Sequence, residues 1–405
     1  MEVISTDNMM AKRNYSHGLD LSYLIEGFVD PAPDINVAIT GVSFDSRSIS
    51  PDELFIAIDG NQTSGSKFID DAIRKGAVAV LVDDKSQART GSRAVPVIYI
   101  PDLRMRVGII ADRFYGEPSQ ELKVIGVTGT NGKTSVCHFI AQALSNQGER
   151  FVGVIGTLGY GGYGKLEAGS NTTPDAVSVH RLLSCFRDQT AEYVVMEVSS
   201  HALEQYRVSG VRFDTVVFTN LSHDHLDYHD DMDAYANTKK KLFQMEGLKG
   251  AVINIDDQLG KQLVSILKGN VPVISYGVAK DRDDGLSPEV QAVVTKEDTW
   301  SMTLGITSPW GAGELSANLT GSFNAYNLLA VLSVICQQNI PFAEALKRLS
   351  RVTNIPGRME CFSNANSASI FVDYAHTPDA LQQALVSLRK LCSGKLICVF
   401  GCGGG

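Results

Sequence analysis

The chain has 405 residues, enough for about two or three domains that each bury a core. Its formal net charge of −9 argues against a general nucleic-acid-binding surface, although a local basic pocket for a small anion remains compatible with it. The longest apolar run, residues 77–82, is too short to span a membrane, and the seven cysteines are scattered without paired spacing, so we expect reduced thiols, a cytoplasmic location and no membrane insertion.

The first part of the chain alternates short apolar strands with helical stretches. Strands are predicted over residues 37–47, 53–60 and 77–84. A helix is predicted over residues 68–76, ending at Gly76. The turn-rich residues 115–119 then predict a boundary, so we expect a first domain over residues 1–120.

The central part carries the longest apolar runs. Buried strands are predicted over residues 122–127, 151–156, 192–198, 215–220 and 250–256. Helical spacing over residues 135–148 predicts a helix closed by Gly148, and residues 313–340 predict a strand, a turn and a long helix. Strands that alternate with helices predict an α/β fold with a doubly wound parallel sheet, here assigned to residues 121–355.

The last part begins near residue 356 and reads as an incomplete unit. A strand over residues 368–376, a helix over 380–392 and a strand over 395–405 are predicted. A strand–helix–strand unit is not a complete domain, so residues 356–405 are expected to be the start of a third domain that continues in a longer protein.

Residues 126–135, GVTGTNGKTS, form a phosphate-binding motif. They fit G-x-x-x-x-G-K-[ST] and lie between a predicted buried strand and a predicted helix, which is the context the motif requires. Backbone N–H groups and the helix N-terminus would hold phosphates, with Lys133 reaching the β- and γ-phosphates and Thr134 binding Mg²⁺. The ATP-binding residues expected from this loop are Gly129, Thr130, Asn131, Gly132, Lys133, Thr134 and Ser135. A glycine-rich turn without a ligand is the weaker alternative.

The TGTNGKT wording resembles the Mur ligase family, to which folylpolyglutamate synthase and cyanophycin synthetase also belong. Further stretches match the family in order, at residues 45–60, 197–208, 219–229, 235–243, 321–330 and 356–379. The resemblance implies a monomer of three domains, with a central P-loop ATPase-like sheet and a truncated Rossmann-like C-terminal domain. It implies an ATP-dependent acid–amino-acid ligase of peptidoglycan precursor synthesis that acts through an acyl phosphate.

Within the family, the motif set looks most like members that add meso-diaminopimelate or L-lysine to UDP-N-acetylmuramoyl-L-alanyl-D-glutamate. GRMEC and VFGCGG favour diaminopimelate, but the stretch that selects the amino acid is expected beyond residue 405. Another Mur-type ligase, a folylpolyglutamate synthase-like amide ligase and a non-catalytic nucleotide-binding homologue are the alternatives. The first two should lack the DSR, NTT and SSHxLxQxR set that this chain has.

The resemblance also assigns a magnesium site and its catalytic residues. Thr134, Glu197 and His225 would surround the metal, and Lys239 aligns with a lysine that the family carries as a carbamate, an anion that can also hold Mg²⁺. A carboxylate suits a hard cation, whereas histidine is a less usual magnesium ligand. Solvated charges are the alternative for His225 and for the lysine run that contains Lys239. With Lys133, these residues form the expected catalytic set.

Two further groups of residues are assigned by resemblance. ATP contacts are expected from Asn324, Asn327, Arg358, Asp373 and His376, although Asn324 has helix capping as a competing role. The sugar-nucleotide and dipeptide parts of the substrate are expected to meet Phe44, Ser46, Asn61, Gln62, Thr63, Asn171, Thr172, Thr173, Ser199, Gln205 and Arg207. Neutral donors with one arginine suit a substrate that carries carbonyls and carboxylates.

Overall fold

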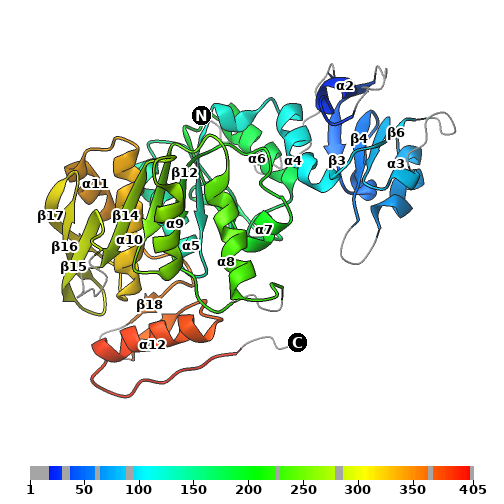
Figure 1. Ribbon diagram of the computed structural model, residues 1–405. Coiled ribbons are helices and arrows are strands. Elements are labelled where there is room, and N and C mark those ends of the chain that lie inside the picture. Colours follow the sequence, from blue (N-terminus) through cyan, green and yellow to red (C-terminus); the bar gives the residue numbers. More distant parts are fainter. Residues whose placement is uncertain are drawn as a thin grey trace. The chain divides into compact units, whose positions relative to one another are not determined.

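The computed structural model describes residues 18–29, 37–59, 64–87, 95–224, 228–278, 286–363 and 368–401. These residues form two compact units (Figure 1). The first unit takes in Met1–Leu122, Thr173–Thr190 and His201–Val211, and the second Lys123–Thr172, Ala191–Ser200 and Arg212–Gly405. Among the described helices, none has the length and apolar character needed to cross a bilayer.

The first unit contains a four-stranded parallel sheet of order β3-β4-β5-β6. Its strands are β3 (Gly41–Ser43), β4 (Glu53–Ala57), β5 (Ala79–Val82) and β6 (Val97–Tyr99). Successive side chains of a strand point to opposite faces, and the two faces bury different clusters. Leu54, Ile56 and Leu81 pack with α4 (Leu103–Phe114), whereas Phe55 and Val80 pack with α3 (Ile69–Arg74).

The predicted strands and helix of this unit are confirmed, with shorter bounds. The strand expected over residues 37–47 is divided into β2 (Ala38–Ile39) and β3, and β2 pairs antiparallel with β1 (Leu19–Asp20). Helix α2 (Leu21–Leu24) follows β1 directly. Helix α6 (Ala176–Asp188) packs against α4, so a segment from the middle of the sequence completes the first unit.

The second unit is built on one eleven-stranded sheet of order β10-β9-β8-β11-β7-β12-β13-β14-β15-β16-β17. Its strands are β7 (Lys123–Thr128), β8 (Val152–Gly156), β9 (Gly159–Gly162), β10 (Lys165–Glu167), β11 (Tyr193–Glu197), β12 (Phe213–Phe218), β13 (Gly250–Asn254), β14 (Val273–Val278), β15 (Val290–Glu297), β16 (Met302–Ser308) and β17 (Gly311–Ala317). The strands from β8 to β15 in this order run parallel, which confirms the predicted parallel sheet. Both edges are antiparallel, a feature that the sequence analysis did not predict.

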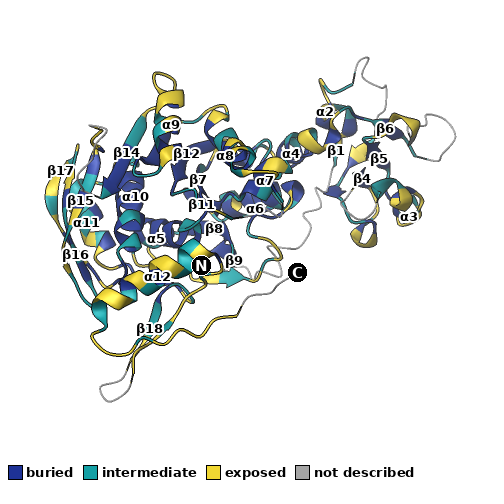
Figure 2. Ribbon diagram, turned by 60° about the horizontal axis from the view of Figure 1, so that its bottom comes forward, coloured by how far each residue is buried: buried dark blue, intermediate teal, exposed yellow. Residues whose placement is uncertain are grey.

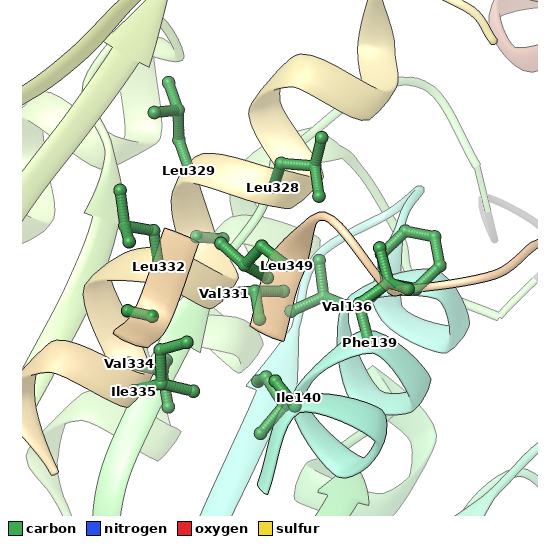
Figure 3. Packing of buried hydrophobic residues seen from close by; sticks show 14 of the residues in the cluster. Val136, Phe139, Ile140, Leu328, Leu329, Val331, Leu332, Val334, Ile335 and Leu349 are labelled. Atoms are coloured by element: carbon green, nitrogen blue, oxygen red, sulfur yellow. The ribbon is translucent and has the colours of Figure 1, made fainter. Parts of the chain in front are cut away.

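Apolar helices cover the sheet of the second unit. Helices α5 (Lys133–Ser145), α10 (Phe323–Gln337) and α11 (Phe342–Leu349) bring Val136, Phe139, Leu328, Val331 and Leu349 into one buried cluster (Figure 3). This unit also contains α8 (Met232–Lys240) and α9 (Gln258–Leu267). Of α7 (Ser200–Glu204), Ser200 belongs to the second unit and the residues from His201 belong to the first. Helix α5 ends at Ser145, three residues before the predicted Gly148, because Asn146 already adopts the left-handed conformation (φ 47°).

The last segment forms a two-stranded antiparallel sheet and one helix. Strands β18 (Glu360–Phe362) and β19 (Ile370–Val372) pair, and α12 (Pro378–Leu391) follows. Figure 2 shows many exposed residues along α12, in contrast to the buried central sheet. The prediction of a strand over residues 395–405 is wrong for the described residues 395–401, where no neighbouring strand pairs with the backbone and Val399 is 94% exposed.

Candidate active site

The phosphate motif lies at the carboxyl ends of adjacent parallel strands. Strand β7 runs into the loop and is flanked by β11 and β12. From β7 the chain passes to β8 and β11 on one side of it, and then to β12 on the other, so the strand order reverses at β7. Ligands of open α/β sheets bind in the crevice at this switch point. Glu197 ends β11, and Thr219 and Asn220 follow β12 at the same edge.

Close packing and hydrogen bonds fix the loop between β7 and α5. At Gly129 (φ 148°) a Cβ would lie 1.9 Å from Thr219 Oγ1, so only glycine fits there. The Thr219 hydroxyl donates to the Asn131 carbonyl (2.7 Å), and the Asn131 N–H donates to Asn220 Oδ1 (2.9 Å). The Thr130 N–H donates to the Asn220 carbonyl (2.8 Å), so β12 holds the loop in shape.

Two lysines meet on one carbonyl of this loop. Lys133 Nζ donates to the carbonyls of Gly129 (2.9 Å) and Thr130 (2.8 Å). Lys239 Nζ, from the end of α8, donates to the same Gly129 carbonyl (2.9 Å). The predicted pair of lysines is therefore brought together at the loop that would hold phosphates.

Lys239 is buried, with 1% of its surface exposed, so the alternative that it is a solvated charge is wrong. Burial, and after it the positive charge of Lys133, hold the pKa of Lys239 well below its usual value, while Asp224 opposes the shift. Burial also lowers the pKa of Lys133, and Arg358 adds to that effect. The Lys239 ammonium lies 4.3 Å from the ring centre of Tyr235, one turn earlier on the same helix.

Thr134 and Glu197, two of the candidates for a magnesium site, are in direct contact. Thr134 Oγ1 donates to Glu197 Oε2 (3.0 Å), and Glu197 is 1% exposed. Thr157 donates its N–H to Glu197 Oε1 (2.8 Å) and its hydroxyl to Oε2 (3.2 Å). A buried carboxylate beside a hydroxyl offers the oxygen ligands that magnesium prefers, so these residues fit the metal.

The third candidate ligand, His225, lies outside the described residues. Within the part of the chain that the structure describes, no cluster of three or more His, Cys, Asp and Glu side chains is arranged to hold a metal ion. A magnesium site here would therefore combine the carboxylate and hydroxyl oxygens with ligands from the phosphates or water, as is usual for this ion.

A cavity of about 390 Å³ opens beside the loop in the second unit. It is lined by the predicted ATP-binding residues Asn131, Gly132, Ser135, Asn324, Asn327, Arg358, Asp373 and His376. Other lining residues come from α5, from β13 and the turn after it, from α10 and from α12, and include Phe139, Asn254, Asp256, Asp257, Tyr326 and Asp379. The cavity therefore gathers the predicted residues from segments far apart in the sequence.

The two asparagines of α10 form a buried pair in the cavity wall. Asn327 Nδ2 donates to Asn324 Oδ1 (2.8 Å), and Asn324 Nδ2 donates to the Thr320 carbonyl (2.8 Å). The helix begins at Phe323 with Ser322 at the cap position, so the alternative role of Asn324 as the helix cap is wrong. Its place inside the first turn leaves its side chain in the cavity wall.

Residues of the last segment contact the loop directly. Arg358 Nη2 donates to Thr134 Oγ1 (3.1 Å), and its guanidinium lies 4.6 Å from the ring centre of Tyr374. Asp373 accepts the backbone N–H groups of Met359 (2.8 Å) and Ala375 (2.9 Å), so it also holds this segment in shape.

Two other contacts complete this wall of the cavity. Asn131 Nδ2 donates to Asp379 Oδ2 (3.3 Å) in the first turn of α12. His376 contacts the Tyr374 carbonyl through Nδ1 (2.9 Å). The phosphate loop is thus tied to the last segment through both Asn131 and Thr134.

The predicted substrate residues are divided between the two units. In the first unit Arg207 donates to the Thr173 carbonyl (2.9 Å) and, through two nitrogens, to Gln205 Oε1 (2.7 and 3.1 Å). Phe44 packs on the core of that unit and Ser46 is buried. Asn171, Thr172 and Ser199 belong to the second unit, and Asn61, Gln62 and Thr63 lie outside the described residues.

Several residues of the site were missed by the sequence analysis. Asn254 and Asp256 fall at the end of the predicted strand 250–256, where the rule that open sheets bind ligands at carboxyl ends would have found them. Thr157 follows the predicted strand 151–156 in the same way. Tyr235 carried a sequence match, but no local pattern shows that its hydroxyl contacts Thr130 Oγ1 (3.2 Å).

The site and the sheet define a class of protein with a P-loop at the switch point of an open α/β sheet and a cavity beside that loop. Comparison with family models assigns residues 38–115 to "Mur ligase family, catalytic domain", 127–335 to "Mur ligase middle domain" and 357–405 to "Mur ligase, glutamate ligase domain".

Individual relatives agree with these assignments. A protein of Coxiella burnetii named UDP-N-acetylmuramoyl-L-alanyl-D-glutamate--2,6-diaminopimelate ligase is 46% identical over 388 residues, covering 96% of this chain and 79% of that protein. A protein of the same name from Chromobacterium violaceum is 43% identical, covering 93% of this chain and 76% of that protein. A solved structure with this enzyme name is 31% identical, with a TM-score of 0.79 and coverage of 96% and 77%. The chain belongs to the Mur ligase family and is an ATP-dependent ligase.

Proposed function

We propose that the chain joins meso-diaminopimelate to UDP-N-acetylmuramoyl-L-alanyl-D-glutamate in peptidoglycan precursor synthesis. The observation that carries this proposal is the convergence of Lys133, Lys239, Thr134 and Glu197 on one phosphate loop that opens into a cavity of about 390 Å³. The substrate assignment is supported by the two relatives at 46% and 43% identity, whose names specify this acid and this amine. L-Lysine becomes the less favoured amine.

ATP would bind with its phosphates at residues 129–135 and its base and ribose in the cavity. The N–H groups of the loop and the N-terminus of α5 point positive charge at the phosphates. Asn324 and Asn327 would contact the adenine edge, and Arg358 a phosphate. Thr134 and Glu197, with His225 by resemblance, would hold the magnesium ion, which supplies charge neutralisation when bound.

The reaction requires positioned reactants and charge neutralisation, and no nucleophilic side chain. The γ-carboxylate of the D-glutamyl residue attacks the γ-phosphorus of ATP, giving an acyl phosphate and ADP. The incoming amine then adds to the acyl carbon, loses a proton and expels phosphate as the amide forms. Lys133 would neutralise charge on the transferred phosphoryl group, and the loop would hold it in line.

Lys239 is proposed to react with CO₂ and carry a carbamate. The nucleophile for CO₂ is a neutral amine, and the burial of Lys239 together with the nearby Lys133 favours that neutral form. The amine nitrogen bonds to the carbon of CO₂, one C=O π bond opens to give the carboxylate, and a proton leaves the nitrogen, so the neutral amine becomes an anion beside a second lysine. The new carboxylate would add an oxygen ligand near Thr134 and Glu197.

The remaining assignments follow from the same family membership. We propose that residues 1–120 bind the UDP part of the substrate, through Phe44, Ser46 and residues 61–63. Residues 121–355 would bind ATP, and Asn171, Thr172, Thr173, Ser199, Gln205 and Arg207 would hold the dipeptide part. Residues 356–405 would begin the domain that binds the amino acid. The protein is proposed to act as a monomer in the cytoplasm.

Phosphate release tests this function. The protein, in a form that includes the whole C-terminal domain, is incubated with ATP, magnesium, the UDP-muramoyl dipeptide and either meso-diaminopimelate or L-lysine. We expect phosphate and tripeptide product with diaminopimelate, and little with lysine. Omission of the dipeptide should abolish phosphate release. Product with lysine alone would overturn the choice of amine, and no phosphate above background with either amine would overturn the ligase function.

A further inference from the structure

Thr157, directly after β8, holds both oxygens of Glu197. Its N–H donates to Oε1 (2.8 Å) and its hydroxyl to Oε2 (3.2 Å). The preceding residue packs as closely, because a Cβ at Gly156 would lie 2.4 Å from Glu197 Oε1. The backbone at residues 156–157 is therefore built around this carboxylate, although the motifs of the sequence did not include it.

The same Thr157 hydroxyl contacts the predicted substrate segment. Thr157 Oγ1 lies 3.1 Å from Thr172 Oγ1. The neighbouring Asn171 is held through its backbone, since the Tyr160 hydroxyl donates to its carbonyl and accepts its N–H (3.3 Å). A continuous line of hydrogen bonds thus runs from Thr134 through Glu197 and Thr157 to Thr172, and all of these residues belong to the second unit.

The direction of this line is set at its carboxylate end. An ionised carboxylate only accepts hydrogen bonds, so the single hydroxyl proton of Thr157 is given to Glu197. The Thr172 hydroxyl must then donate to Thr157, and it offers only lone pairs to any substrate group. A cation bound to Glu197 takes up lone pairs of the carboxylate, so the hydrogen bond that Glu197 accepts from the Thr157 hydroxyl becomes weaker. The hydrogen bond between Thr157 and Thr172, and with it the capacity of the Thr172 hydroxyl to bond a substrate group, changes in turn.

We propose that Thr157 is a positioning residue that couples the metal-binding carboxylate Glu197 to the substrate segment at Asn171 and Thr172. Metal binding at one end of the line then changes the affinity for the dipeptide substrate at the other, and the reverse holds by linkage. This inference rests on the proposed function, because the substrate that meets Thr172 is the UDP-muramoyl dipeptide.

Equilibrium binding tests the coupling without turnover. The affinity for the UDP-muramoyl dipeptide is measured by calorimetry with ADP present, once with magnesium and once with EDTA. In the unsubstituted protein the two affinities should differ by about fivefold or more. Thr157→Val, which keeps the backbone N–H but removes the hydroxyl, should reduce the difference to below about twofold. Thr157→Ser, which keeps the hydroxyl, should restore it.

Controls separate coupling from folding. Thr157→Ala removes the same hydroxyl without adding a methyl group beside the carboxylate, and it should lose the coupling as Thr157→Val does. Thr303→Val removes one hydroxyl of a similar pair, in which Thr303 Oγ1 lies 3.1 Å from Ser316 Oγ on the antiparallel edge of the sheet. This variant should keep the full difference in dipeptide affinity between magnesium and EDTA. Each variant should melt close to the unsubstituted protein.

The outcomes distinguish this inference from the proposed function. The role of Thr157 would be overturned, with the proposed function left intact, by either of two results. One is full coupling in both Thr157→Val and Thr157→Ala, and the other is equal dipeptide affinity with and without magnesium in the unsubstituted protein. If the unsubstituted protein fails to bind the dipeptide under either condition, the proposed function fails and this inference fails with it.

Discussion

Replacing Lys239 by methionine should remove a pH dependence of stability. Burial and the charge of Lys133 hold the pKa of Lys239 well below its usual value in the folded protein, whereas an unfolded lysine titrates near 10.4. At pH values between these two pKa values the unfolded chain binds more protons than the folded one. The free energy of unfolding therefore rises with pH across that window, by up to about 1.4 kcal/mol per pH unit from this one lysine.

The two tryptophans of the chain give a suitable probe, because Trp300 and Trp310 both belong to the second unit with Lys239. Denaturant unfolding followed by tryptophan fluorescence is measured at several pH values from about 7 to 10, in buffers depleted of CO₂. We expect a smaller slope of the unfolding free energy against pH in Lys239→Met than in the unsubstituted protein.

Lys240→Met is the matched control, since Lys240 is the next residue of α8 and its ammonium group donates to Asn237 Oδ1 (3.1 Å) in an exposed hydrogen bond. This variant should keep the slope of the unsubstituted protein. Equal slopes in Lys239→Met and the unsubstituted protein would show that the ammonium form of Lys239 is not disfavoured by folding, and the reasoning would fail.

Further changes have defined outcomes. Added bicarbonate should raise the unfolding midpoint of the unsubstituted protein but not of Lys239→Met, and equal stabilisation of both proteins would argue against the carbamate. Lys239→Ala, which leaves space at this position, should lose activity that added short carboxylic acids partly restore. Lys133→Ala should lower kcat by about 10²-fold or more in the phosphate-release assay, and near-normal turnover would contradict its assignment. Tyr235→Phe removes the hydroxyl that contacts the loop and should weaken ATP binding about fivefold in a filter assay. The control is Tyr193→Phe, which loses a hydroxyl contact with Lys123 (3.3 Å) at the start of β11 and should bind ATP normally.

Local patterns were sufficient to predict the central parallel strands and the phosphate loop. Residues 122–127 form a buried apolar run, and the loop that follows needs glycine at positions whose backbone conformation or packing allows no other residue. The antiparallel edges were missed for a physical reason. Strand β9 is short and glycine-rich and β10 has only three residues, so neither length nor apolar alternation distinguishes them from a turn.

The phosphate motif and the family resemblance named eight of the cavity-lining residues, but the contacts of this site depend on pairings between distant segments. Arg358 reaches Thr134 across 224 positions of sequence, and Asn131 reaches Asp379 across 248. No periodicity reports such contacts. The strand predicted over residues 395–405 is wrong over the described residues 395–401 for the opposite reason, because apolar composition favours a strand only where a neighbouring backbone accepts its hydrogen bonds.

A negatively charged chain and a site for polyanions are compatible because the positive groups are concentrated. The net charge is −9, yet Lys133 and Lys239 meet on one carbonyl and Arg358 contacts the adjoining Thr134. A carbonyl oxygen carries only a partial charge, so it does not neutralise two ammonium groups. Burial is the largest cause of the lowered pKa of both lysines, and a neighbouring positive charge adds to it, Lys133 for Lys239 and Arg358 for Lys133. The burial of two lysines at one loop would therefore suit both of their proposed roles, the neutralisation of phosphate charge by Lys133 and the reaction of a neutral Lys239 amine with CO₂.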